Sequence, residues 1–117
     1  MRTHKDLDAW KKSIELVTDI YKLTNNFPKS EQYGLISQIR RSAISVSSNI
    51  AEGAGRQHNK EFIQFLYISL GSLSELETQL IISVNLKYIN NKDFIDLNEK
   101  MKDIRNLING LIRYIKK

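Results

Sequence analysis

The sequence has no cysteine, a single proline and only five glycines among its 117 residues. The missing cysteines exclude disulfides, thiol nucleophiles and cysteine-ligated metals. Few prolines and glycines leave few points where the chain must break, which favours a few long elements over many short strands. No stretch approaches the roughly 20 apolar residues of a membrane span, and the first residues lack the apolar core of a signal peptide. We therefore expect a cytoplasmic protein with no membrane partner.

What the sequence does contain is ordinary for a globular protein. Hydrophobic residues make up 41% and charged residues 26%, in a length that suits one domain with one core. The formal net charge is +5. A mildly basic balance suits nucleic acid or an acidic partner, and it is also common in proteins that bind neither.

Apolar residues recur at helical spacing in four consecutive segments. In the first segment the main stripe is Leu7, Trp10, Ile14, Val17 and Tyr21, widened by Leu16, Ile20 and Leu23. The second segment repeats Ile36, Ile39, Ala43, Val46 and Ile50. The third has Phe62, Leu66, Leu73, Leu76 and Leu80, broadened by Phe65, Ile68 and Leu70. The fourth is a heptad of Phe94, Leu97, Met101, Ile104, Ile108, Leu111 and Ile115.

Turn residues separate these segments. Asn25-Asn26-Phe27-Pro28 ends the first, because the residue before proline is pushed out of the α region. Ser30 is the predicted cap of the second, which Gly53-Ala54-Gly55 ends, and Asn59 is the predicted cap of the third. Asn90-Asn91 marks the last turn. The pattern predicts helices over approximately 6–25, 31–53, 59–88 and 91–116 of one domain spanning 1–117. Short loops between helices this long predict an all-α, antiparallel, up-down-up-down four-helix bundle.

Catalytic and metal-binding patterns are sparse. The two histidines, His4 and His58, both lack the glutamate three residues earlier that di-iron bundles use, so no metal site is predicted. No histidine is placed to assist a serine nucleophile, and the glycines before Arg56 lack P-loop spacing. We therefore predict no enzymatic activity, no catalytic residue and no cofactor. An acid–base pair of Glu52 and Glu75 is the remaining enzymatic alternative.

The second segment is unusually rich in serine and alanine. One face of this helix carries Ser37, Arg41, Ser45, Ser48 and Glu52. Two interpretations stay open: a surface for a subunit or ligand, and tight helix packing with polar side chains paired inside the bundle. In the second, a partly buried Glu75 needs a partner, and Arg40 or Arg41 is the natural one. The predicted structural polar network comprises Arg40, Arg41, Asn49, Glu52 and Glu75.

The basic residues form two sets along the chain. One lies upstream of, or flanks, the turn between the second and third segments, and the other follows the fourth segment to its end. A solvated surface explains either set, and so does contact with nucleic acid. The candidate nucleic-acid-binding residues are Arg56, Lys60, Lys116 and Lys117.

Several stretches together resemble one protein family. They are Ser37-Gln38-Ile39-Arg40-Arg41-Ser42-Ala43, Ser48-Asn49-Ile50-Ala51-Glu52-Gly53, and residues 6–10, 27–28, 61–66 and 71–80. Over nearly its whole length the chain is similar to bacterial four-helix bundle proteins first recognised as products of intervening sequences in large-subunit ribosomal RNA genes. It is also similar to the accessory variability proteins of diversity-generating retroelements. It departs from the pattern at His58-Asn59, where family members often carry a serine–aspartate cap.

The resemblance implies an up-down bundle assembled as a ring-shaped homopentamer, with no catalytic residue. The similar retroelement proteins are basic pentamers, which implies RNA or DNA and a reverse transcriptase as partners. We expect a non-enzymatic, oligomeric binding protein that contacts RNA or another nucleic acid through its basic surface. The alternative is a structural or protein-interaction module with no nucleic-acid role. The wide apolar faces of the first and third segments also favour a homo-oligomer.

Overall fold

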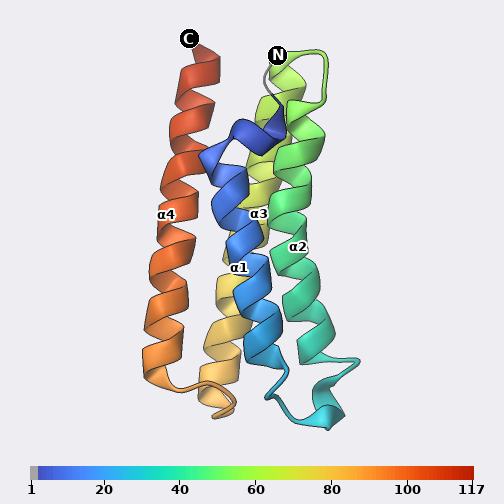
Figure 1. Cartoon of the computed structure of the whole chain (residues 1–117), viewed down its shortest axis with the longest axis vertical. Helices are drawn as coiled ribbons and strands as arrows, with labels where there is room; N and C mark the ends of the chain where they lie inside the picture. The colour runs from blue at the N-terminus through green and yellow to red at the C-terminus, as the bar shows by residue number, and fades with distance from the viewer. Residues whose placement is uncertain (1–2) are drawn as a thin grey trace.

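The computed structural model describes residues 3–117, so the first two residues of the predicted domain lie outside it. This part of the chain contains no strand. It forms four α-helices, α1 (Asp8–Thr24), α2 (Leu35–Ala54), α3 (Asn59–Asn85) and α4 (Asn91–Lys116), and two short 3-10 helices, η1 (His4–Asp6) and η2 (Lys29–Glu31). Successive helices run in opposite directions (Figure 1), and the predicted four-helix bundle is confirmed.

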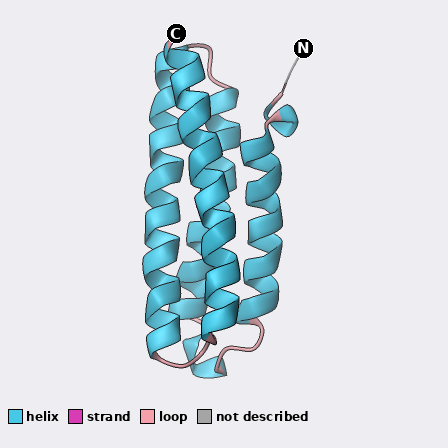
Figure 2. Ribbon diagram, turned by 90° about the vertical axis from the view of Figure 1, so that its left-hand side faces the viewer, coloured by secondary structure: helices cyan, strands magenta, loops and turns pink. Residues whose placement is uncertain are grey.

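Each helix packs against two neighbours, in the cyclic order α1, α2, α3, α4. The contact between α2 and α3 is the most extensive, and that between α1 and α4 is the least. The helices follow the long axis of a bundle measuring 44 × 24 × 20 Å, and their connections lie at its two ends (Figure 2). Within residues 3–117, no helix is both long and apolar enough to cross a bilayer.

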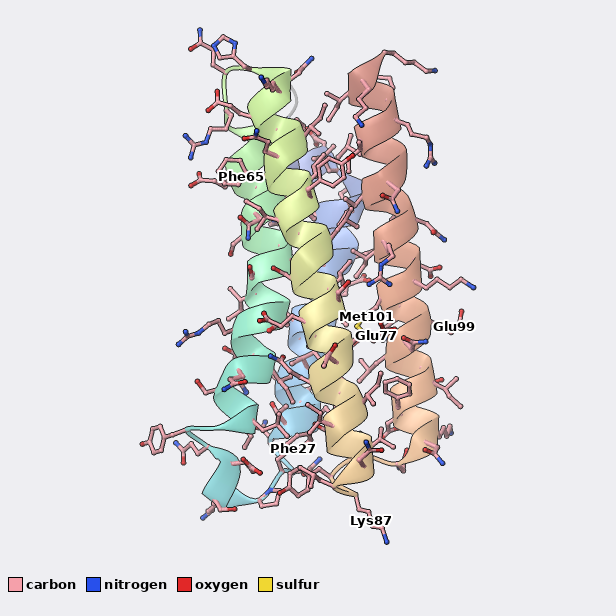
Figure 3. The ribbon with its side chains drawn as sticks, turned by 180° about the vertical axis from the view of Figure 1, so that it is seen from behind. Phe27, Phe65, Glu77, Lys87, Glu99 and Met101 are labelled. Atoms are coloured by element: carbon pink, nitrogen blue, oxygen red, sulfur yellow. The ribbon has the colours of Figure 1, made fainter. Side chains whose placement is uncertain are left out.

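The core confirms the stripe predicted for α2 and most of that predicted for α3. All five predicted residues of α2 are buried: Ile36, Ile39, Ala43, Val46 and Ile50. In α3, Leu66, Leu73, Leu76 and Leu80 are fully buried, whereas Phe62 is half-buried. Met101 of α4 projects between α3 and α4 and is also fully buried (Figure 3).

In α1 the buried stripe is not the one with the strongest apolar periodicity. Residues that face the core are Ala9, Ser13, Leu16, Ile20 and Thr24. The predicted stripe is wrong at Ile14 and Tyr21, which are exposed. Ser13 and Thr24 can be buried because their hydroxyls donate to the carbonyl oxygens of Ala9 and Ile20, at 2.6 and 2.8 Å. A hydroxyl that is hydrogen-bonded within its own helix does not need water and can be buried. Because serine and threonine are not apolar, the predicted stripe did not include them.

The heptad predicted for α4 drifts out of the core at its C-terminal end. Leu97, Met101, Ile104 and Ile108 are buried as predicted, but the next buried residue is Ile112. Leu111 is only half-buried. An α-helix has 3.6 residues per turn, so a strict repeat of 3.5 rotates away from a straight partner within a few turns.

The start of α2 and two predicted helix caps differ from prediction. α2 begins at Leu35 rather than near residue 31, because the chain first forms η2 and a further turn. Ser30 therefore lies within η2 and caps no α-helix. Asn59 is the first residue of α3, and the cap position belongs to His58, whose side chain makes no capping hydrogen bond. Asn90 does cap α4, since its Oδ1 accepts the Asp93 N–H at 2.8 Å.

Aromatic and polar contacts tie together the end of the bundle where α1 and α3 finish. The Phe27 and Tyr88 rings lie 5.3 Å apart, and the Tyr88 hydroxyl donates to Glu31 Oε2 at 2.9 Å. That hydrogen bond to a carboxylate, together with burial and the nearby negative charge, raises the pKa of Tyr88. The turn from α3 to α4 is thereby held against η2.

Candidate nucleic-acid interface

Up-down topology brings the two predicted sets of basic residues to the same end of the bundle. The start of α1, the turn from α2 to α3 and the last turns of α4 all lie there (Figure 1). We define the basic end as residues 3–12, 51–61 and 105–117. It carries the cations Lys5, Lys11, Lys12, Arg56, Lys60, Arg105, Arg113, Lys116 and Lys117 and the anions Asp6, Asp8, Glu52 and Glu61.

The remainder of the described chain is close to electrically balanced. It holds eight basic residues against nine acidic ones. The helix dipoles add little at the basic end, because two helices begin there and two finish there. The positive charge of the molecule is therefore a property of one end, and it comes from side chains.

Arg56 and Lys60 project from the turn between α2 and α3. The Arg56 Nη2 lies 3.6 Å from Glu52 Oε1, and its guanidinium lies 4.8 Å from the centroid of the Phe65 ring. An exposed ion pair one helical turn apart contributes little to stability, so Arg56 stays accessible. Phe65 lies beside α2 near this turn (Figure 3). Lys60 is exposed and makes no hydrogen bond or ion pair within residues 3–117.

Lys116 connects the end of α4 to α3. Its Nζ donates to the Tyr67 hydroxyl at 3.2 Å and lies 5.7 Å from the centroid of the Tyr67 ring. Lys117 follows it and is exposed. Tyr67 was not identified from the sequence, because it lies in α3 while the basic residues near it lie in α4. The structure thus places an exposed aromatic ring beside the basic end.

The predicted pairing of Glu75 with an arginine is wrong within this chain. Glu75 is exposed and accepts a hydrogen bond from Ser42 Oγ at 2.9 Å. Arg40 points instead toward α1, where its Nε donates to Thr24 Oγ1 at 2.9 Å. Arg41 is exposed and forms no ion pair with any described residue. Arg40 and Ser42 are two positions apart, about 200° around the helix, so they contact different neighbours.

Small polar side chains do join α2 to α3, as the packing interpretation predicts. The Ser45 and Ser72 hydroxyls share a hydrogen bond at 2.8 Å, and Asn49 Nδ2 donates to Ser45 Oγ at 2.9 Å. Ser69 Oγ donates to the Val46 carbonyl oxygen at 2.8 Å. These short side chains satisfy one another across the most extensive helix contact of the bundle.

Glu52 and Glu75 do not share a site. Glu52 pairs with Arg56 at the end of α2, whereas Glu75 bonds to Ser42 near the middle of the same helix. Ten residues of α-helix separate Ser42 from Glu52, which corresponds to about 15 Å. Two carboxylates so far apart cannot act on one substrate atom, so the acid–base alternative is excluded for the single chain.

Comparison with known proteins agrees with this architecture. A model of the family described as "23S rRNA-intervening sequence protein" matches residues 5–110. The chain belongs to this family. A crystal structure from Bacteroides thetaiotaomicron, described as a protein with unknown function from the S23 ribosomal protein family, is 28% identical. The similarity covers 89% of this chain and 97% of that one, with a TM-score of 0.79. No curated protein matches the chain. The family resemblance seen in the sequence is thus confirmed.

Proposed function

We propose that this member of the 23S rRNA-intervening sequence protein family is a non-enzymatic, oligomeric binding protein whose basic end contacts RNA or another nucleic acid. The observation that carries the proposal is the charge separation along the bundle. Cations outnumber anions by about two to one at the basic end, while the rest of the described chain is balanced. The family name links the protein with an intervening sequence of 23S rRNA, so single-stranded and structured RNA are the first ligands to test.

The basic end is suited to phosphates rather than to base edges. Its lysines and arginines are long, mostly exposed side chains on several elements, which follow a backbone of negative charges without reading sequence. Tyr67 adds a ring on which an unpaired base can stack. In an oligomer every subunit repeats this end, so weak contacts add through avidity. The interaction we propose is electrostatic and is either non-specific or specific for shape.

A salt titration tests this function. Displaced counterions make affinity fall with salt, with a log–log slope of about −0.7 per phosphate neutralised on single strands and about −0.9 on duplex DNA. We expect the Arg56→Ala/Lys60→Ala and Lys116→Ala/Lys117→Ala variants each to flatten the slope on single-stranded RNA by about 1.4, which is two phosphates. Fluorescence anisotropy of labelled RNA at several salt concentrations measures the slope.

The matched control removes two positive charges from the opposite end. Lys22 and Lys92 are exposed residues near the end of α1 and the start of α4, so Lys22→Ala/Lys92→Ala has the same net charge as either test variant. Its slope should equal that of the parent. If the control flattens the slope as much as the test variants do, net charge rather than the basic end governs binding. No binding of the parent to RNA or DNA at low salt would contradict the proposed function.

The second candidate function is a protein-interaction module, and exposed apolar residues favour it. The outer face of α3 carries Tyr67, Ile68, Ile81 and Ile82, and Leu86 follows at its end, all at least two-fifths exposed. Such a face is typically covered by protein. The family resemblance suggests two partners that could cover this face: further copies of the chain and a reverse transcriptase. Co-purification with an RNA-independent protein partner, in the absence of any RNA affinity, would favour this candidate.

A further inference from the structure

A second cationic surface lies away from the basic end, in a groove between α1 and α2. Its main cavity measures about 470 Å³ and adjoins a smaller one of about 200 Å³, and Gln32, Ile36 and Arg40 line both. The two cavities together are lined by three basic residues and by no carboxylate. We define the α1–α2 groove by Arg40, Arg41, Lys29, Tyr21, Tyr33 and Gln32. It lies near the end of α1 and the start of α2, where these helices are side by side (Figure 1).

Arg40 is a fixed positive charge with no anionic partner. Its Nε donates to Thr24 Oγ1 at 2.9 Å, and its Nη2 donates to Asn25 Oδ1 at 3.1 Å and to the Tyr21 carbonyl oxygen at 3.4 Å. All three acceptors are neutral. The guanidinium also lies over the Tyr21 ring, 4.3 Å from its centroid. Nη1 donates to no described residue, so two N–H groups of an oriented guanidinium are free for a ligand.

The carboxylate closest in sequence is engaged elsewhere. Glu31 accepts the Leu35 N–H at 3.3 Å on Oε1 and the Tyr88 hydroxyl at 2.9 Å on Oε2. Arg41 is exposed beside Arg40 in the same lining. Arg40 is thus a guanidinium held in place by neutral groups, with a second guanidinium nearby and no competing anion. Such an arrangement is suited to donating two parallel hydrogen bonds to the oxygens of a phosphate.

The other side of the groove is aromatic and apolar. Tyr33, in the turn before α2, is 92% exposed, and Ile36 and Ile44 contribute apolar lining next to it. A flat apolar group stacked on such a ring would remove it from water. An exposed tyrosine beside a cationic groove is the arrangement on which unpaired bases stack in single-stranded nucleic acids. An acidic peptide with no apolar side chain would use the arginines and leave Tyr33 in water.

We propose that the α1–α2 groove binds one nucleotide, with its phosphate on Arg40 and Arg41 and its base against Tyr33. The nucleotide is either free or one unit of a single strand, since both present the same phosphate and base. The proposal goes beyond the proposed function, because the groove is separate from the basic end and binding there does not require it.

Titration of the full chain with AMP, with adenosine and with a short 5′-phosphorylated oligoadenylate, by calorimetry, tests the proposal. Arg41→Ala and Tyr33→Ala are the informative variants, because both side chains are exposed and make no hydrogen bond or ion pair with a described residue. Each should weaken AMP binding about tenfold, as expected for losing one charge-assisted hydrogen bond or one stacked base. Adenosine should bind more weakly than AMP. Lys102→Ala and Ile95→Ala, exposed positions on α4, remove similar charge and apolar surface elsewhere and should leave AMP affinity unchanged.

The outcomes separate the alternatives. Equal affinity for AMP and the oligoadenylate supports a free nucleotide as ligand, and a much tighter oligoadenylate supports a single strand. The proposal is overturned if the parent binds neither probe, or if Arg41→Ala and Tyr33→Ala bind both as the parent does. It is also overturned if these variants change only the mass of the assembly, because the groove is then a contact between copies.

Oligoadenylate binding that depends on Lys116 and Lys117 alone overturns this proposal and leaves the proposed function intact. AMP binding without any salt-dependent RNA affinity supports the nucleotide site in the groove and overturns the proposed function.

Discussion

Lys87, two residues after the end of α3, has a backbone conformation that lysine seldom adopts. Its φ is 65°, in the left-handed region where Cβ crowds the next carbonyl. Two hydrogen bonds hold it there: its N–H donates to the Val84 carbonyl oxygen and the Tyr88 N–H donates to that of Ser83, both at 2.9 Å. This is a Schellman motif, whose left-handed position glycine occupies without strain. We therefore expect Lys87→Gly to raise the free energy of unfolding by about 1 kcal/mol, measured by urea denaturation.

Lys102→Gly is the control for this prediction. Lys102 is exposed in the interior of α4, where glycine costs about 1 kcal/mol of helix stability relative to a good helix former. The same substitution should therefore change stability in opposite directions at the two positions. A Lys87→Gly protein that is no more stable than the parent would contradict the strain argument.

Individual side-chain contacts were the least predictable feature from the sequence. Arg40 and Ser42 are close in sequence, yet one reaches α1 and the other reaches α3. Glu75 therefore meets a serine where an arginine was predicted. Predicting which neighbour a side chain contacts requires knowing how each helix is rotated about its own axis. Apolar periodicity indicates which side of a helix faces the core, but not its rotation to the accuracy of a single residue. Buried Ser13 and Thr24 blur the periodicity further, because their hydroxyls bond within α1.

At the scale of the elements, Gly53 sets how closely α2 approaches α3. A Cβ at this position would lie 2.7 Å from Phe65 Cβ and 2.9 Å from Phe62 Cδ1, both closer than real contacts allow. Gly53→Ala must push the helices apart, and overpacking of this kind costs about 1–3 kcal/mol. The better helix propensity of alanine returns up to about 1 kcal/mol. We expect a net loss of stability in thermal or urea unfolding.

Gly71→Ala separates packing from helix propensity. Gly71 lies on the exposed face of α3, and a Cβ there would meet no atom within 4 Å. This variant should be more stable than the parent by about 0.5–1 kcal/mol, because it gains propensity without a clash. If Gly53→Ala gained as much stability as Gly71→Ala, the close approach at the end of α2 would not be a constraint.

The existence and order of the four helices could be predicted from the sequence, while several ends could not. Long apolar stripes and few breaking residues leave little choice of element type. The start of α2 was missed because Ser30 resembles a cap, although the chain needs η2 and another turn before it can enter the helix at Leu35. The end of α3 lies at Asn85 rather than residue 88. This end was not predicted because the left-handed position after the helix, usually a glycine, is occupied by Lys87.

For the molecule as a whole, topology converts two separate basic stretches into one charged end. The turn after α2 and the end of α4 are far apart in sequence, and they meet because an up-down bundle returns to the same end with every second helix. The sequence identified Arg56, Lys60, Lys116 and Lys117 as candidates, and the fold places all four there. Tyr67 and the α1–α2 groove depend on neighbours from other helices, so they required the structure.

The outer face of α3 leads to the last prediction, which concerns assembly. Exposed Ile81 and Ile82 lie on a helix whose opposite face is already buried in the bundle, so α3 carries large apolar side chains on both sides. Neighbouring apolar side chains left exposed on a packed helix are typically covered by protein, and further subunits can supply that cover. We predict a homo-oligomer, with five copies of the 13.6 kDa chain favoured by family resemblance alone. Native mass spectrometry or light scattering at micromolar concentration measures the number of copies.

Ile82→Lys tests whether α3 makes the subunit contact. Because Ile82 is 43% exposed within one chain, the substitution should change monomer stability only slightly, whereas a lysine buried between subunits would lose hydration without gaining a partner. We expect smaller assemblies with unchanged helical content. Gln57→Lys adds the same charge in the exposed turn between α2 and α3, and it should leave the assembly intact. A parent that is monomeric at micromolar concentration would refute the oligomer. An oligomeric parent with an unaffected Ile82→Lys variant would move the contact to another face, and the α1–α2 groove would then be the next surface to mutate.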